Sequence, residues 1–152
     1  MKEIKFLDPS IERKKKITNK NFQLIKGTNI PLPSEVEISE SGVCNRKCSF
    51  CPRSDPSYED INEFINSNLH SKLINQLKDL DYGGVIRYSG FVEPLLDKNI
   101  YNLVKEVSLK LPNCRREIVT NGDVLNGKRL RKLFDSGLST ILISVYDGPE
   151  DA

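Results

Sequence analysis

The sequence predicts an α/β protein built around a parallel sheet, and three observations carry this prediction. Short β-forming stretches and amphipathic helical stretches alternate along the chain in the order βαβαβαβ. The connections between them are short, and such an alternation favours parallel strands joined by right-handed crossovers, with helices on the outer face. Finally, three of the 4 cysteines follow the first predicted strand. They therefore lie at the edge of the sheet where ligands bind in folds of this kind.

Each predicted element has its own signal in the sequence. Residues 35–39 alternate polar and apolar side chains, which predicts a strand with one polar face. Apolar residues recur at helical spacing over residues 61–80, with Asp60 as the predicted N-cap and Gly83-Gly84 as the stop. The later elements follow the same logic: a strand at 84–90, a helix from its cap Asp97 to Pro112, a strand at 116–122, a helix around 130–134 that Gly137 ends, and a strand at 139–145.

An unusual motif follows each of the four predicted strands. The cysteine group follows the first strand, and the stretches SGFVEP, TNG and SVYDG follow the second, third and fourth. Because the carboxyl ends of parallel strands lie along the same edge of a sheet, we expect these four motifs to form one site.

The composition is that of an ordinary soluble domain with one core, since 38% of the 152 residues are hydrophobic and 29% are charged. The formal net charge of +2 gives no reason to expect nucleic acid or a membrane surface as the main partner. Pro31 and Pro33 close a leading segment without long periodic stretches. We therefore expect residues 1–33 to form an N-terminal extension that packs on a core domain of residues 34–152.

No stretch approaches the roughly 18 apolar residues of a membrane span, and the charged start of the chain lacks the apolar segment of a secretion signal. These features predict a cytoplasmic protein. In that reducing compartment, clustered thiols are interpreted first as metal ligands or redox groups rather than as disulfides.

The three clustered cysteines are Cys44, Cys48 and Cys51. Thiolates are soft ligands that select zinc, copper(I) or an iron–sulfur cluster. Structural zinc prefers four protein ligands, and a fourth ligand from Cys114 or His70 would be distant in sequence. We interpret Cys114 as a small packed hydrophobic residue and His70 as a surface or half-buried residue. An iron–sulfur cubane on three cysteines would leave one iron open to an exogenous ligand.

The spacing Cys44-x3-Cys48-x2-Cys51, with Phe50 before the last cysteine, resembles the signature of the radical S-adenosylmethionine (radical SAM) enzymes. GFVEP, residues 90–94, resembles the Gly-Gly-Glu-Pro type motif of that family, which engages the methionine amino group; here valine replaces the glycine before the glutamate. VTNG and ISVYDGPE resemble the motifs that close the third and fourth strands. The resemblance implies three cluster ligands, Cys44, Cys48 and Cys51, and seven cofactor-binding residues, Gly90, Phe91, Val92, Glu93, Asn121, Ser144 and Tyr146.

The fold implied by the resemblance is a partial (β/α)6 barrel whose strands line a substrate cavity. The matching residues end soon after the fourth strand, so we expect the barrel to be incomplete at the C-terminus. In that fold Arg87 and Ser89 would point into the interior while Ile86 and Tyr88 meet the helices; partly solvated edge polarity is the alternative.

The activity implied by the resemblance uses a 4Fe–4S cluster and S-adenosylmethionine (SAM) as cofactors. An electron from a cytosolic donor such as flavodoxin or ferredoxin cleaves SAM, and the 5′-deoxyadenosyl radical abstracts hydrogen from a peptide, a sugar or a similar metabolite. Two alternatives remain open: a non-catalytic zinc module, or a degenerate radical SAM fold used for binding. The positive charges of Arg46, Lys47 and Arg53 either lower the thiol pKa values or only increase solubility.

Overall fold

The structure is a computed structural model that describes residues 11–12, 15–16 and 22–146. Most of the predicted extension at residues 1–33 and the end of the SVYDG motif lie outside these residues. In the described part of the chain, no helix is long and apolar enough to cross a membrane.

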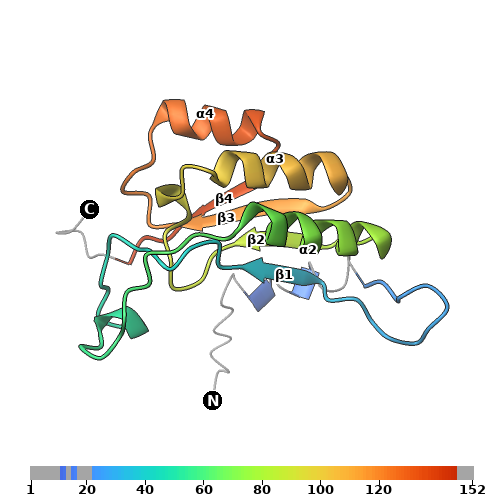
Figure 1. Ribbon diagram of the computed structural model, residues 1–152, viewed down its shortest axis with the longest axis horizontal. Coiled ribbons are helices and arrows are strands. Elements are labelled where there is room, and N and C mark those ends of the chain that lie inside the picture. The colour runs from blue at the N-terminus through green and yellow to red at the C-terminus, as the bar shows by residue number, and fades with distance from the viewer. Residues whose placement is uncertain (1–10, 13–14, 17–21, 147–152) are drawn as a thin grey trace, which may run out of the picture.

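The described residues form one parallel sheet covered by helices. The strands lie in the order β1-β2-β3-β4, and every neighbouring pair is parallel. Helices α2 (Ser67–Asp79), α3 (Ile100–Lys110) and α4 (Gly127–Asp135) lie together on one side of this sheet (Figure 1), so the predicted α/β fold class is confirmed. The elements are β1 (Glu35–Ile38), η1 (Pro52–Ser54), α2 (Ser67–Asp79), β2 (Val85–Tyr88), η2 (Pro94–Leu96), α3 (Ile100–Lys110), β3 (Arg115–Thr120), α4 (Gly127–Asp135) and β4 (Thr140–Ile143).

Helix α2 begins later than predicted. Its N-cap is Asn66, whose side chain accepts a hydrogen bond from the Asn68 amide, and the predicted cap Asp60 is wrong. Residues 61–66 instead run beside the chain that leaves β1, where the Ile65 amide donates to the Glu40 carbonyl at 2.7 Å. The apolar residues of this segment match a helical period, but tertiary pairing outweighs that local preference.

The ends of the other helices show how local capping residues act. The Asp97 side chain accepts from the Asn99 amide at 2.7 Å, but Asn99 is the N-cap of α3, so the predicted cap is two residues early. Gly137 confirms its predicted role as the stop of α4, because its φ of +95° suits glycine. A Cβ at that position would lie 2.2 Å from the Ser108 Oγ, so glycine also allows α3 to approach.

The hydrophobic core lies between the sheet and the helices. On β2 the side chains of Ile86 and Tyr88 are fully buried in this core. Arg87 projects from the other face, where it pairs with Glu35 on β1 and donates to Glu117 on β3 at 2.8 Å. The predicted alternation along this strand is therefore confirmed.

His70 is wrongly predicted as a surface or half-buried residue, because its side chain is fully buried. Its Nδ1 lies 2.8 Å from the Glu106 carboxylate and its Nε2 lies 2.8 Å from the Tyr88 hydroxyl. Burial tends to raise the pKa of Glu106, but hydrogen bonds from Lys110, Ser71 and His70 lower it to about 2. Since Glu106 is a carboxylate, Nδ1–H donates to it. His70 thus connects α2, α3 and β2.

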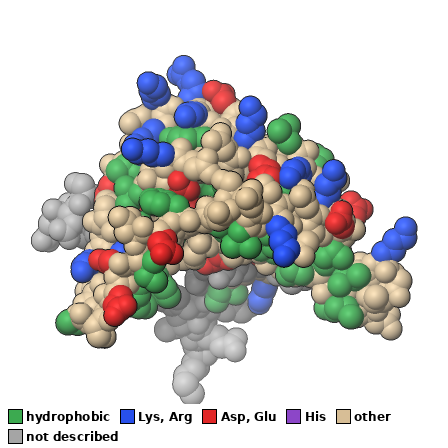
Figure 2. All heavy atoms as spheres, viewed as in Figure 1, with side chains coloured by type: hydrophobic (Ala, Val, Ile, Leu, Met, Phe, Trp, Pro, Cys, Tyr) green, Lys and Arg blue, Asp and Glu red, His purple; other side chains and the backbone are tan. Residues whose placement is uncertain are grey.

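Helix α4 is strongly amphipathic. Leu133 is buried, whereas Lys128, Arg131 and Lys132 are exposed, and Figure 2 shows blue cationic side chains over this helix at the top of the view. Arg129 differs from these residues because it donates to the Leu95 carbonyl at 3.1 Å. It therefore links α4 to η2.

Candidate cofactor site

The four motifs that follow the strands meet at one end of the molecule, as predicted. The loop after β1, the connection from β2 to η2 and the end of β4 lie at the left of the view in Figure 1. A cavity of about 220 Å³ opens among them. Its lining includes all three clustered cysteines and all seven residues predicted to bind the cofactor: Cys44, Cys48, Cys51, Gly90, Phe91, Val92, Glu93, Asn121, Ser144 and Tyr146.

The cysteine loop is shaped by short-range hydrogen bonds. The Cys51 amide donates to the Cys48 carbonyl at 2.9 Å, and the Ser54 hydroxyl donates to the Cys51 carbonyl at 2.8 Å. The three thiols are half-buried and none of them is in a disulfide. The Arg46 amide lies 3.5 Å from the Cys44 sulfur, where it can donate to a thiolate.

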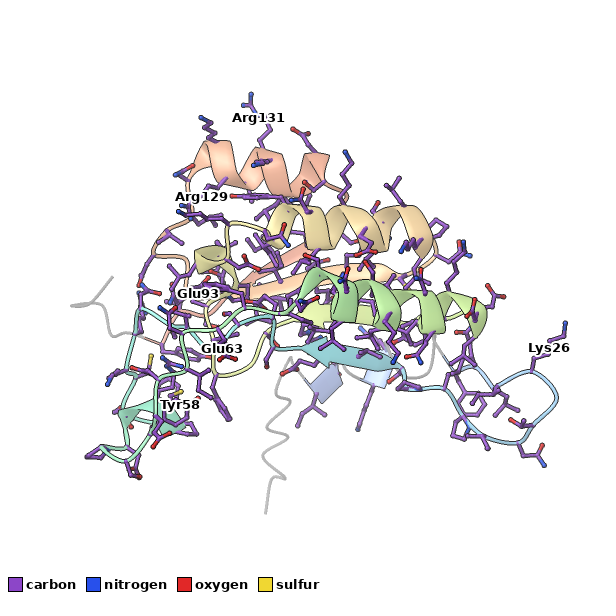
Figure 3. All side chains as sticks on the ribbon, in the orientation of Figure 1. Lys26, Tyr58, Glu63, Glu93, Arg129 and Arg131 are labelled. Carbon is purple, nitrogen blue, oxygen red and sulfur yellow. The ribbon has the colours of Figure 1, made fainter. Side chains whose placement is uncertain are left out.

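Glu93 connects the loop after β2 to the end of β3. Its carboxylate is buried, with Oε1 accepting from the Thr120 hydroxyl at 2.6 Å and from the Leu95 amide at 3.0 Å. Its Oε2 accepts from the Asn121 amide at 2.7 Å. Figure 3 shows Glu93 at this end of the sheet. This structural role was not predicted from the sequence, although an acid before Pro94 that caps η2 is a recognisable local signal.

Gly90 is required where it stands. Its φ is +128°, and a Cβ there would lie 2.3 Å from the Ser39 Oγ. That hydroxyl in turn donates to the Ser89 carbonyl at 3.0 Å, so the ends of β1 and β2 are in close contact. The predicted loop motif thus begins with a glycine, because the positive φ favours glycine and a larger side chain would clash with Ser39.

A second polar network joins the cysteine loop to the loop after β3. The Asp123 carboxylate accepts from Asn45 at 2.7 Å and from Arg46 Nε at 2.8 Å. The Asn121 side chain donates to Asn45 at 2.9 Å. Hydrogen bonding from Arg46 lowers the pKa of Asp123. Asp123 was not predicted, because its partners lie 77 and 78 positions away in the sequence.

The predicted fourth ligands for zinc lie elsewhere. Cys114 is buried in the core, where its thiol donates to the Tyr82 carbonyl at 3.1 Å, and burial raises its pKa to about 11. His70 is held between Glu106 and Tyr88. Among the described residues, no group of three or more His, Cys, Asp or Glu side chains is arranged to hold a metal ion.

The chemistry of these residues fits an iron–sulfur cluster. In a cubane each thiolate binds a different iron, so the sulfurs surround a space instead of meeting at one ion. Three free thiols on the wall of one cavity provide this donor set. The cavity wall also contains Arg53, whose Nε is buried without a hydrogen-bond partner among the described residues.

The family of the chain follows from its sequence as well as from this site. A family model described as the radical SAM superfamily matches residues 38–151. This match spans more than half of the chain, and the chain therefore belongs to the radical SAM superfamily. The predicted family is confirmed.

Two curated relatives show which enzymes this chain is similar to. It is 34% identical over 115 residues to the S-adenosyl-L-methionine-dependent 2-deoxy-scyllo-inosamine dehydrogenase of Niallia circulans, a match that covers 76% of this chain and 46% of the relative. It is 26% identical over 121 residues to the GTP 3′,8-cyclase of Clostridium perfringens, a match that covers 76% of this chain and 35% of the relative. The chain thus spans less than half of each of these proteins.

Two solved structures of BtrN have the same fold. The complex of BtrN with AdoMet and 2-DOIA matches with a TM-score of 0.72 and 34% identity, over 77% of this chain and 47% of that one. An open conformation of BtrN matches with a TM-score of 0.69 and 31% identity, over 79% of this chain and 54% of that one. The family and the AdoMet complex support the predicted cofactors, a 4Fe–4S cluster and SAM. The roles of the individual residues remain predictions.

Proposed function

We propose that this chain forms the cofactor-binding part of a radical SAM enzyme. Cys44, Cys48 and Cys51 would hold a 4Fe–4S cluster, and the loops after β2, β3 and β4 would hold SAM against it. The observation that supports this proposal is the single cavity lined by all three thiols and by every predicted SAM-binding residue. When bound there, the cluster would supply the one-electron reductive cleavage of SAM, with the electron coming from a donor such as flavodoxin or ferredoxin, for hydrogen abstraction from the substrate.

The residues around the cavity orient the cofactor and hold its charges. We assign Oε2 of Glu93 and the carbonyl of Val92 as acceptors for the ammonium group of SAM. Oε2 already accepts from the Asn121 amide, but a carboxylate oxygen has two acceptor positions. Ser144 lines the same cavity. We assign its hydroxyl to the ribose or the carboxylate of SAM.

An aromatic pair borders the cavity. The rings of Phe50 and Tyr146 meet edge to face with their centroids 4.6 Å apart, and both rings remain more than half exposed. We propose that this pair covers the adenosine part of SAM and excludes water from it. Apolar cover of this kind protects a reactive intermediate.

For the substrate we propose a small polyhydroxylated metabolite, which is oxidised at a hydroxyl-bearing carbon. The support is the 34% identity to a protein named as an inosamine dehydrogenase. The same segment also resembles a GTP cyclase, and the two relatives are named for different substrates. We therefore propose that the shared residues bind the common cofactors and that other residues contact the substrate.

The first test is anaerobic reconstitution followed by assays for iron, sulfide and zinc. Electron paramagnetic resonance (EPR) spectra of the reduced protein are then recorded with and without SAM. We expect a cubane signal that SAM shifts, loss of that signal in Cys48→Ala, and 5′-deoxyadenosine after reduction. Cys114→Ala is the matched control, because this thiol is buried in the core and should be dispensable for the cluster.

Three results would contradict the proposal. Zinc bound without sulfide would identify a metal module, and a cluster signal that SAM leaves unchanged would identify a fold that no longer uses SAM. Equal cluster loss in Cys48→Ala and Cys114→Ala would show that the cysteine loop is not the specific ligand set.

A further inference from the structure

Arg53 is buried to an unusual degree for a charged residue. It lies in η1, two positions after Cys51, and only 2% of it is exposed. Arginine is rarely buried unless its charge and its N–H groups are compensated. Its surroundings therefore indicate what it does.

The guanidinium group joins three separate segments. Its Nη1 donates to the Gly42 carbonyl at 2.9 Å and to the Phe91 carbonyl at 3.2 Å. Its Nη2 pairs with the Asp60 carboxylate, and its Cζ lies 5.2 Å from the centre of the Tyr58 ring. Figure 3 shows Tyr58 at the same end of the molecule as Glu93. Arg53 thus ties the cysteine loop to the chain before it and to the predicted SAM loop.

One donor of this group has no protein partner. The Nε–H of Arg53 is buried and donates to no acceptor among the described residues, while Arg53 itself lines the main cavity. A buried N–H without an acceptor is costly, so the burial of Arg53 calls for an explanation.

We propose that Arg53 is a positioning residue that docks the cysteine loop onto residues 90–93 and brings a permanent positive charge to the cluster. This inference rests on the proposed function. Lysine could not replace the group, because only a guanidinium presents several donors in one plane to two carbonyls and a carboxylate. The charge would stabilise the reduced, more negative state of the cluster and so raise its reduction potential.

The test compares Arg53→Gln, Arg53→Lys and a control, Lys47→Gln. Lys47 lies in the same loop with its Nζ 3.8 Å from the same Asp60 carboxylate, but 66% of its side chain is exposed. Three quantities are measured: the reduction potential by EPR-monitored titration, the affinity for SAM from the EPR shift, and amide hydrogen exchange at residues 90–93 in the cluster-free protein.

Arg53→Gln should lower the reduction potential, weaken SAM binding about tenfold and speed exchange at residues 90–93, because it removes both the charge and the forked hydrogen bonds. Arg53→Lys should keep the potential but lose SAM affinity and loop protection. Lys47→Gln should resemble the wild type in all three measurements, because solvent screens its charge.

The proposal is overturned if a folded Arg53→Gln protein has the reduction potential, SAM affinity and hydrogen exchange of the wild type. It is also overturned if Lys47→Gln changes the reduction potential as much as Arg53→Gln does. Should Arg53→Gln fail to fold, unchanged SAM affinity and exchange in Arg53→Lys would overturn it. A wild-type protein that binds no cluster, or whose cluster ignores SAM, would refute the proposed function instead. Cluster-free hydrogen exchange would still report whether Arg53 docks the loop.

Discussion

Replacing Glu93 by glutamine should destabilise the protein, because three donors converge on its buried carboxylate. Leu95 N–H and the Thr120 hydroxyl point to one oxygen, and Asn121 N–H points to the other. Glutamine keeps only one acceptor oxygen, so either orientation of its amide places an NH₂ group against a backbone N–H. One buried amide donor loses its acceptor, which costs about 1–3 kcal/mol.

The lost charge modifies this value only slightly. Bonds to a carboxylate are stronger than bonds to a neutral amide, which adds to the loss. Glu40 lies near enough to interact electrostatically with Glu93, but its pKa of about 8 keeps it mostly protonated at neutral pH, so little repulsion is relieved. We therefore expect the free energy of unfolding to fall by about 2 kcal/mol.

Urea denaturation of the cluster-free protein, followed by far-ultraviolet circular dichroism, measures this change at neutral pH. The control is Glu63→Gln, an exposed glutamate whose substitution should change the free energy of unfolding by less than about 0.5 kcal/mol. A Glu93→Gln protein within that same margin of the wild type would refute the role of this carboxylate as a link between the β2 and β3 loops.

Two further predictions concern the chain around this carboxylate. Burial raises the pKa of Glu40 from its ordinary value of 4.5 to about 8. Between these values the unfolded chain releases the proton and the folded one keeps it, so stability should fall as pH rises from about 5 to 8; urea titrations should show a flatter dependence in Glu40→Gln, and identical slopes would disprove the assignment. Gly90→Ala should cost about 1–3 kcal/mol in thermal or urea unfolding, because of its positive φ and the contact with Ser39. Gly127→Ala, which meets nothing within 4 Å, should be nearly neutral, and equal losses in both variants would contradict the steric argument.

Much of the fold was predictable because its signals are local. The alternation on β2 and the glycine that ends α4 depend on periodicity and backbone freedom, which neighbouring residues determine. The three cysteines and the motifs at the strand ends could likewise be assigned to one edge, because parallel strands bring their carboxyl ends together.

The errors occurred where distant residues decide the local structure. Residues 61–66 have helical spacing, yet backbone pairing with the chain after β1 holds them extended. His70 has a polar side chain and was therefore expected at or near the surface. Glu106 and Tyr88 supply hydrogen-bond partners for both of its ring nitrogens, so the side chain can be buried. Neither set of partners is visible in a short window of sequence.

The sequence by itself therefore determined the order of strands and helices, the soft-ligand chemistry of Cys44, Cys48 and Cys51, and the family that this chemistry indicates. Only the tertiary structure decided which charged groups support the site: Glu93 beneath the β3 loop, Asp123 against Arg46, and Arg53 between the cysteine loop and Phe91. The physical reason is that a charge can be buried only where partners from several segments compensate it, and folding alone brings those segments together.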